Sequence, residues 1–276
     1  MTILVTGATG SVGRLVVDEL VAAGVPVRAL TVDPERAQLP AEAEVVVGSL
    51  ARPSTLPVAL KDVSAVYLAP MARTVRRFCE LAAAAGVERV VALSGSSVGD
   101  EHEGSSGHEY AAVEAAVRDA GFAWTFLRPG MFMNNTLDWA PMVQAGEVAM
   151  AYGDATATPI DLRDIAAVAA RVLTTEGHIG ATYVLSGPEA ISQRRQVETL
   201  ASVLGREIRF RELTPDEQRA RWIAYGVPED AVGWLLEGFE ESLRYPQVPT
   251  GVVEELLGRP GTTYAEWVEA NRAVFA

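Results

Sequence analysis

Short apolar runs rich in Val, Ile and Leu alternate with longer amphipathic segments over the first half of the chain. Continuous apolar runs are typical of strands that helices cover on both faces, and the alternation indicates βαβ units with a parallel sheet. The runs predicted as strands are Ile3–Thr6, Val27–Thr31, Val45–Val47, Ala65–Leu68, Val90–Ser94 and Trp124–Arg128.

The segments between these runs are predicted as helices, and a glycine follows three of them. Gly24, Gly86 and Gly121 stand where a helix commonly ends with a residue in the left-handed conformation. Each of these stops leads into an apolar run, which supports the alternation independently. The predicted helices are Val12–Ala23, Ser54–Lys61, Arg73–Ala85 and Glu109–Ala120.

The pattern changes after residue 130, where the apolar runs become shorter. Asp164 is expected to cap an Ala-rich helix over Ile165–Thr174, and residues 187–192 to form a turn ending in a helix cap. The other elements expected here are strands at Val148–Ala151 and Thr182–Ser186 and a helix at Gln193–Leu204.

Residues 208–276 are expected to be helical and acidic. Aromatic side chains at helical spacing usually belong to a core, and some of these are expected to line a substrate cleft. The aromatic residues concerned are Trp222, Tyr225, Trp234, Phe239, Tyr245, Tyr264 and Trp267.

These elements together predict an α/β fold, a Rossmann-type doubly wound parallel sheet with a smaller, mainly helical C-terminal substrate region. Residues 1–130 are assigned to a dinucleotide-binding domain that about residues 155–186 are expected to complete. Residues 131–154 and 187–276 are assigned to the smaller region.

Composition narrows the classes of partner. Apolar residues make up 49% of the chain and charged residues 21%, as in ordinary globular proteins. A formal charge of −13 argues against nucleic acid or an anionic membrane as the main partner. No signal peptide or membrane span is expected, so the predicted partner is a small-molecule substrate, and the chain is expected to be a monomer or homodimer.

Cysteine and histidine are scarce, which bears on redox state and metals. Cys79 is the single cysteine, so no disulfide forms within the chain, and a cytoplasmic location is expected. It is interpreted as a buried structural thiol. With three histidines scattered along the chain, no metal site is predicted.

The chemistry-bearing motif is the glycine-rich turn Thr-Gly-Ala-Thr-Gly-Ser-Val-Gly at residues 6–13, between a strand and a helix. Gly7 permits a tight bend, Gly10 lets the backbone approach a diphosphate, and Gly13 allows close helix packing. The N-terminal N–H groups of the helix favour an anion. The motif predicts a nicotinamide dinucleotide site.

This spacing, Gly-x-x-Gly-x-x-Gly, resembles the short-chain dehydrogenase/reductase superfamily in its extended and atypical branches. Further segments resemble the atypical NmrA-like group, which includes quinone-reductase-like enzymes and NADP-sensing regulators. The matching segments are residues 27–30, 47–50, 85–91, 124–130, 159–161 and 164–166.

The resemblance implies an extended NAD(P)H that crosses the carboxyl ends of the strands. The residues it assigns to the diphosphate are Gly7, Thr9, Gly10, Ser11 and Val12, with Gly13 completing the turn. Those beside the adenosine half are Thr31, Val32, Gly48, Ser49 and Leu50. Those beside the ribose, nicotinamide and substrate are Ala69, Pro70, Met71, Ser94, Pro129, Gly130, Met131 and Phe132.

The end of the second strand departs from the family pattern. Many relatives carry an arginine at the position of Val32, where it pairs with a 2′-phosphate of the cofactor. At the position where an acidic residue would bind the ribose 2′-hydroxyl, this chain has Thr31. Ser49 stands where an Asp is usual. Asp33 either reads the ribose or shapes a turn before proline. Arg28 and Arg36 also remain candidates for a 2′-phosphate, so NADP, which the family favours, and NAD both stay open.

The second departure is catalytic. The superfamily's proton donor is the tyrosine of Tyr-x-x-x-Lys, but Tyr110 is followed at that spacing by Glu114. A carboxylate there would raise the pKa of the phenol. In NmrA-like relatives a glutamate often takes this position and a lysine stands one turn earlier, so Tyr110 would replace the lysine, and Glu114 would be structural.

The remaining catalytic candidates are Ser94 at a strand end and His108 in a loop, together with Tyr110. Asn134 and Asn135 either hydrogen-bond a substrate carbonyl or cap a loop. The favoured function is an NAD(P)H-dependent oxidoreductase that transfers hydride to a small conjugated carbonyl or quinone-like acceptor. The alternatives are a non-redox NAD(P)-sensing regulator and a non-redox cyclisation or isomerisation in biosynthesis.

Overall fold

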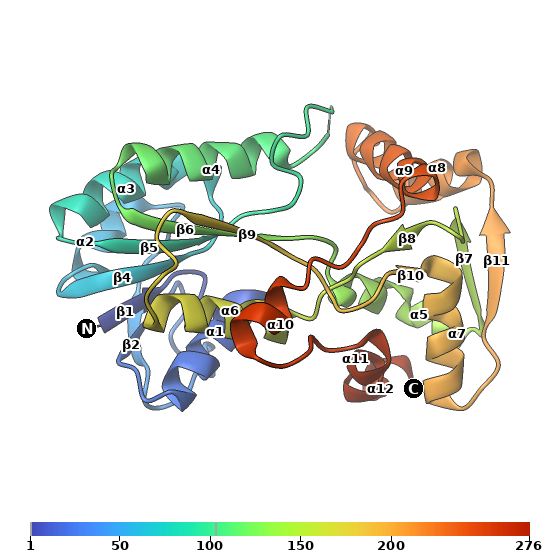
Figure 1. Ribbon diagram of the computed structural model, residues 1–276, viewed down its shortest axis with the longest axis horizontal. Helices are drawn as coiled ribbons and strands as arrows, with labels where there is room; N and C mark the ends of the chain where they lie inside the picture. Colours follow the sequence, from blue (N-terminus) through green and yellow to red (C-terminus); the bar gives the residue numbers. More distant parts are fainter. Residues whose placement is uncertain (1, 103) are drawn as a thin grey trace.

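A twisted parallel sheet lies between two layers of helices in the computed structural model, which describes residues 2–102 and 104–276 (Figure 1). Its seven strands follow the order β3-β2-β1-β4-β5-β6-β9, and every neighbouring pair is parallel. The predicted Rossmann-type fold is therefore confirmed. The strands are β1 (Thr2–Val5), β2 (Val27–Thr31), β3 (Glu44–Val47), β4 (Val63–Leu68), β5 (Arg89–Leu93), β6 (Ala123–Pro129) and β9 (Ala181–Leu185).

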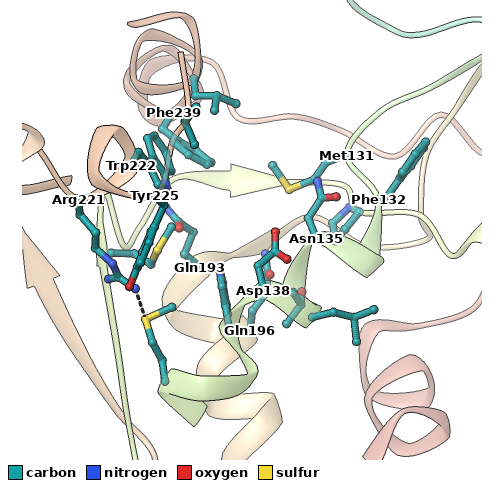
Figure 2. Close-up of a pocket in the computed structure, with 18 of the residues that line it drawn as sticks. Met131, Phe132, Asn135, Asp138, Gln193, Gln196, Arg221, Trp222, Tyr225 and Phe239 are labelled. Atoms are coloured by element: carbon teal, nitrogen blue, oxygen red, sulfur yellow. Dashed lines mark hydrogen bonds between the residues drawn. The ribbon is translucent and has the colours of Figure 1, made fainter. Parts of the chain in front are cut away.

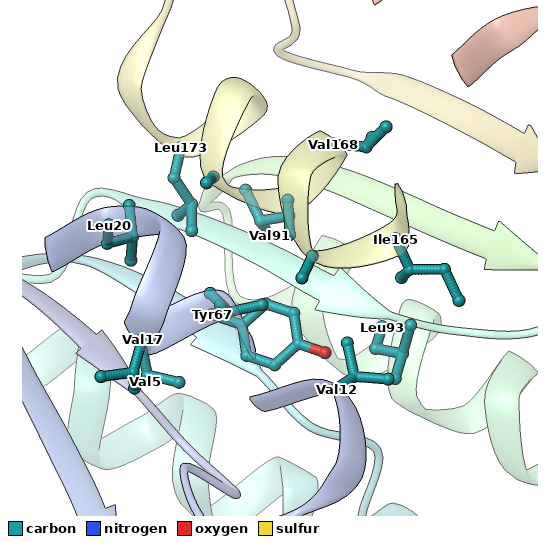
Figure 3. Close-up of a cluster of buried hydrophobic side chains, with 14 of the residues drawn as sticks. Val5, Val12, Val17, Leu20, Tyr67, Val91, Leu93, Ile165, Val168 and Leu173 are labelled. Atoms are coloured by element: carbon teal, nitrogen blue, oxygen red, sulfur yellow. The ribbon is translucent and has the colours of Figure 1, made fainter. Parts of the chain in front are cut away.

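Alternate residues of each strand pack on opposite faces, which explains why the runs are apolar throughout. Ile3 and Val5 belong to one core with helices α1 and α6, whereas Leu4 belongs to a second core with α2, α3 and α4. Figure 3 shows the first core, with Tyr67 among aliphatic side chains from α1 and α6. These helices are α1 (Ser11–Ala22), α2 (Leu56–Ala59), α3 (Val75–Ala84), α4 (Gly107–Asp119) and α6 (Leu162–Thr174).

The C-terminal part lies beside the sheet and has a core of its own, which includes the fully buried Tyr264 and Trp267. It also holds two small sheets, β10–β8 and β11–β7. Its elements are η3 (Met133–Trp139), α5 (Ala140–Gln144), β7 (Glu147–Ala151), β8 (Thr156–Ala157), β10 (Ile191–Ser192), α7 (Gln193–Leu204), β11 (Arg209–Leu213), α8 (Pro215–Ala224), α9 (Glu229–Arg244), α11 (Tyr264–Ala270) and α12 (Arg272–Phe275). The remaining helix, α10 (Val252–Leu257), packs against α6 and joins the first core of the main sheet.

Most helices begin and end close to the residues predicted from the sequence. Gly24, Gly86 and Gly121 all have positive φ, as expected for residues that end helices. The side chain of Ser192 caps α7 by accepting a hydrogen bond from the backbone N–H of Arg195. Two predicted helices, Ser54–Lys61 and Arg73–Ala85, begin with short 3-10 turns, η1 (Pro53–Thr55) and η2 (Ala72–Thr74).

The predicted cap of α6 was wrong. The helix starts one turn earlier, at Leu162, and the cap is Asp161, whose carboxylate accepts from the backbone N–H of Arg163. Asp164 lies fully buried inside the first turn and accepts hydrogen bonds from the side chain of Arg259 and the backbone of Thr262. Its role is to hold the C-terminal segment against α6, a long-range contact that local sequence does not reveal.

The expectation that residues 208–276 are helical was incomplete, because β11 (Arg209–Leu213) pairs in parallel with β7. Three of its five side chains are charged and it lies at an edge, so it lacks the apolar signature of a buried strand. His108 also lies within the first turn of α4 rather than in a loop. Among the described residues, no helix has the length and apolar character that crossing a bilayer requires.

Candidate active site

The glycine-rich turn joins β1 to α1 where the strand order of the sheet reverses, the place where α/β sheets bind ligands. Gly7 has φ +60°, and the N–H of Gly10 donates to its carbonyl oxygen over 2.8 Å. A Cβ on Gly13 would lie 2.2 Å from that same oxygen, so only glycine fits there.

The N-terminus of α1 is prepared for an anion. Its N-cap residue, Gly10, supplies no side-chain hydrogen bond, so N–H groups of the first turn are left for a ligand. Thr6 ties this turn to the neighbouring strand end, because its hydroxyl accepts from the N–H of Ala69 over 2.8 Å. A dinucleotide diphosphate fits this cradle.

The loop after β2 supports the turn interpretation of Asp33. Its carboxylate accepts from the backbone N–H of Arg36, and its own N–H donates to the hydroxyl of Thr31. Arg28 is held by Glu44 and by two backbone carbonyls of residues 59 and 61. Val32 is exposed, and the exposed Arg36 remains the arginine of this loop that faces solvent.

The other residues assigned to the cofactor follow neighbouring strand ends. Leu50 is fixed by the hydroxyl of Thr74, and Ser49 by the hydroxyl of Thr55. The carbonyl of Pro129 accepts from the N–H of Ser96. The structure thus places the segments after β1, β3, β4, β5 and β6 along one edge of the sheet.

Ser94 and Glu114 form a buried polar network with Arg128. The fully buried Glu114 carboxylate accepts from the hydroxyl of Ser94 and from Arg128 Nε and Nη2, each over 2.7 Å. Arg118 adds a contact of 2.9 Å. Although burial opposes ionisation, these donors hold the pKa of Glu114 below its usual range. The structural role expected for Glu114 agrees with this geometry.

Tyr110 is half-buried with its ring against Gly95, where a Cβ would lie 2.5 Å from the ring. Burial, and secondly the charge of Glu109, raise the pKa of its phenol. The expected cause was Glu114, and that was wrong, because Arg128 and Arg118 neutralise its charge. His108 is exposed on the same helix turn.

A large pocket of about 770 Å³ opens beyond the end of β6, between η3, α7, α8 and α9 (Figure 2). Met131 and Phe132 form the wall nearest the sheet, and Trp222 and Phe239 lie opposite with ring centroids 6.3 Å apart. Some aromatic residues of the C-terminal part thus line a cleft, while Tyr264 and Trp267 are core. The polar residues in the lining are Asn135, Thr136, Asp138, Gln193, Gln196 and Arg221.

The structure separates the two asparagines that follow β6. Asn135 lines the large pocket, whereas Asn134 lines a second hollow of about 470 Å³ beside Gly10 and Ser11. Neither side-chain amide has a hydrogen bond to another described residue, so neither caps the loop. The polar pocket residues far along the chain, Gln193, Gln196 and Arg221, were missed, because only tertiary packing brings them to β6.

Cys79 is buried on α3, as expected, and burial raises the pKa of its thiol to about 11. Within residues 2–102 and 104–276, no cluster of three or more His, Cys, Asp or Glu side chains is arranged to hold a metal ion.

These features define the class of protein. The glycine turn and the uncapped start of α1 lie where the strand order reverses, and an apolar pocket adjoins them, as in dinucleotide-dependent α/β proteins. The family described as NAD(P)H-binding matches residues 7–176, and the chain belongs to it.

Relatives extend over the full chain. One is the (4-alkanoyl-5-oxo-2,5-dihydrofuran-3-yl)methyl phosphate reductase of Streptomyces griseus, 43% identical over 99% of each chain. Another is the NAD(P)H azoreductase of Xenophilus azovorans, 34% identical over 99% of each. The NADPH-dependent quinone oxidoreductase of Escherichia coli, solved with NADPH, has a TM-score of 0.85 and 27% identity, covering 99% of this chain and 100% of that one. The protein is an NAD(P)H-dependent oxidoreductase, and the resemblance inferred from its sequence is confirmed.

Proposed function

We propose that the protein reduces a small, electron-poor conjugated acceptor of the quinone, enone or unsaturated-lactone class in the large pocket. The observation that carries this proposal is that Met131 and Phe132, which are expected beside the nicotinamide, also form a wall of that pocket. The rest of the lining is largely apolar and aromatic, which suits a flat conjugated molecule. The relatives support the class, since their names include a quinone and an unsaturated lactone with an alkanoyl chain.

The cofactor site is proposed to follow the residues expected from the resemblance. Residues 7–13 would hold the diphosphate, with Thr31, Val32, Ser49 and Leu50 beside the adenosine half. Residues 69–71, Ser94 and residues 129–132 would border the nicotinamide half. When bound, NAD(P)H supplies the hydride, and the chain positions the acceptor and excludes water.

A conjugated acceptor needs little acid catalysis, because the incoming charge spreads over its π-system. Tyr110 is the proposed hydrogen-bond donor among the three candidates, because its half-buried phenol forms no hydrogen bond with another described residue. Ser94 already donates to Glu114 and is proposed to position Arg128, while the exposed His108 is the weakest candidate. The proton that completes the reduction would come from solvent, because a raised pKa makes Tyr110 a poor acid.

Asn135 is proposed to donate its amide to the acceptor carbonyl. Asn135→Ala should lower kcat/KM for the acceptor about tenfold, the usual effect of one lost hydrogen bond to developing charge. Gln144→Ala is the control, because it removes an exposed side-chain amide on α5 that lines neither hollow, and kcat/KM should stay within about twofold. Oxidation of NADH and NADPH by a quinone, enone and lactone panel provides the assay. Absence of oxidation with every acceptor, by protein that binds the cofactor, would refute the proposal.

Three broader expectations stay proposals. We propose a division into a dinucleotide-binding domain at 1–130, completed by about residues 155–186, and a smaller region at 131–154 and 187–276. The chain is proposed to act on a small molecule in the cytoplasm as a monomer or homodimer. Gel filtration and limited proteolysis would test the assembly and the division.

A further inference from the structure

We propose that Arg221 is an anion-binding residue of the large pocket, and that the preferred acceptor carries an oxyanion group such as phosphate or sulfonate besides its conjugated system. This inference rests on the proposed function for its substrate, but the anion subsite can be tested without turnover.

The guanidinium of Arg221 enters the pocket from α8 without a carboxylate partner. Its Nη1 donates to the carbonyl oxygen of Ala149 over 2.6 Å, and its Nη2 contacts the thioether of Met142, the dashed line in Figure 2. The ring of Tyr225 lies 5.6 Å from the guanidinium carbon. Among the described residues, no carboxylate oxygen lies within 4.0 Å of it.

Nearby carboxylates are engaged elsewhere, although the chain has a net charge of −13. Glu217, one turn earlier on α8, accepts from the backbone and hydroxyl of Thr214 as part of a capping box. Glu147 pairs with Arg211 over 2.7 Å. Both carboxylates line a smaller hollow that Arg221 also borders, but neither forms an ion pair with it, so its guanidinium is left for an anion in the large pocket.

A partly buried cation with such weak partners is unusual, because desolvated charges are generally paired. A guanidinium has five N–H donors, and a thioether is a weak acceptor that an oxyanion readily replaces. Phosphate and sulfonate match the planar fork of arginine better than a neutral carbonyl does. An anionic group on the ligand would complete this site.

The opposite wall fixes the orientation of such a ligand. Asp138 reaches into the pocket from η3, across from Arg221 in Figure 2, and forms no ion pair with another described residue. The two opposite charges thus lie on opposite walls of a largely apolar pocket. An anionic group is drawn to the α8 end and repelled from η3, which holds the conjugated part toward Met131.

The test compares a naphthoquinone sulfonate with the parent naphthoquinone. Wild-type protein should favour the sulfonate, and this preference should fall as salt rises. Arg221→Gln should raise KM for the sulfonate about 10- to 100-fold while the parent changes by no more than about twofold. Arg219→Gln removes the same charge two residues away, outside the pocket lining, and should leave both unchanged. Equal losses for the two quinones would mean a structural role and would overturn the proposal.

A binding measurement separates this inference from the reductase proposal. Naphthalene sulfonate should quench tryptophan fluorescence, since Trp139 and Trp222 line the pocket. Arg221→Gln should weaken the affinity, Arg221→Lys should partly restore it and Asp138→Asn should strengthen it. These results stand even if no acceptor is reduced. If uncharged naphthalene binds as tightly as the sulfonate to wild-type protein at low salt, there is no anion subsite, whatever the enzyme reduces.

Discussion

Glu114→Gln tests a fully buried charge that joins α4 to β6. The carboxylate is fully buried and accepts four hydrogen bonds, from Ser94, Arg118 and twice from Arg128. Glutamine keeps the size of the side chain but removes its charge and turns one acceptor into a donor facing arginine. Arg128 then loses its counter-ion while most of its side chain stays out of water.

Removing one partner of a buried ion pair costs about 3–5 kcal/mol. Because Arg128 is 23% exposed and Arg118 42% exposed, solvent compensates in part, and we expect a loss of about 2–4 kcal/mol. For a chain of this size that corresponds to a fall in Tm of roughly 4–10 °C. Urea unfolding followed by circular dichroism would measure it, with the exposed Glu109→Gln on the same helix as the control.

The pH dependence of the free energy of unfolding tests the Glu114 ion pair independently. The pKa of Glu114 is lowered in the folded protein, so its contribution is fully present above the unfolded value near pH 4.3 and is lost as pH falls through the folded pKa. The gap between wild type and variant should therefore narrow below about pH 4. A gap under about 0.5 kcal/mol at neutral pH, no larger than an ordinary surface change, would refute this account of the network.

Three further predictions concern the glycine turn, a buried phenol and a surface ion pair. Gly10→Val should abolish dinucleotide binding in calorimetry while the protein stays folded, since a side chain would occupy the anion cradle of α1; unchanged affinity would overturn the placement of the diphosphate. Tyr67→Phe should leave stability unchanged or raise it by about 1 kcal/mol, because the buried hydroxyl has no hydrogen-bond partner among the described residues; a loss above 1 kcal/mol in urea unfolding would contradict this. Burial alone would raise the pKa of Asp100, but hydrogen bonds from His102 and Trp234 lower it to about 2, so Asp100→Asn should destabilise the protein above about pH 4 and progressively less toward pH 2; a pH-independent difference would exclude this ion pair as the cause.

The main sheet could be predicted because its signals are local. Each central strand is buried on both faces and therefore apolar throughout, and the glycines at 24, 86 and 121 mark helix ends by their own backbone conformation. The polar edge strand β11 carries no such signal. Asp164 looked like a helix cap, but its partners, Arg259 and Thr262, lie almost a hundred residues away.

The part of the site that backbone forms could be predicted from the sequence, and the part that packed side chains form could not. The glycine turn is recognisable from residues 7–13 alone, whereas the large pocket is formed by η3, α5, α7, α8 and α9, which sequence alone does not bring together. Glu114 shows the limit most clearly. Its position one turn from Tyr110 on α4 suggested an effect on the pKa of the phenol. The charge of Glu114 is instead neutralised by Arg128, which comes from β6.

The central claim is that the chain moves hydride from NAD(P)H to a conjugated acceptor in the large pocket. Reduction of a naphthoquinone or an alkanoyl-substituted unsaturated lactone with cofactor deuterated on one face at a time tests it most directly. We predict that oxidation slows with deuterium on one face only, and that with the lactone this deuterium appears on carbon in the product. No oxidation with either cofactor, or an equal effect for both faces, would contradict the account.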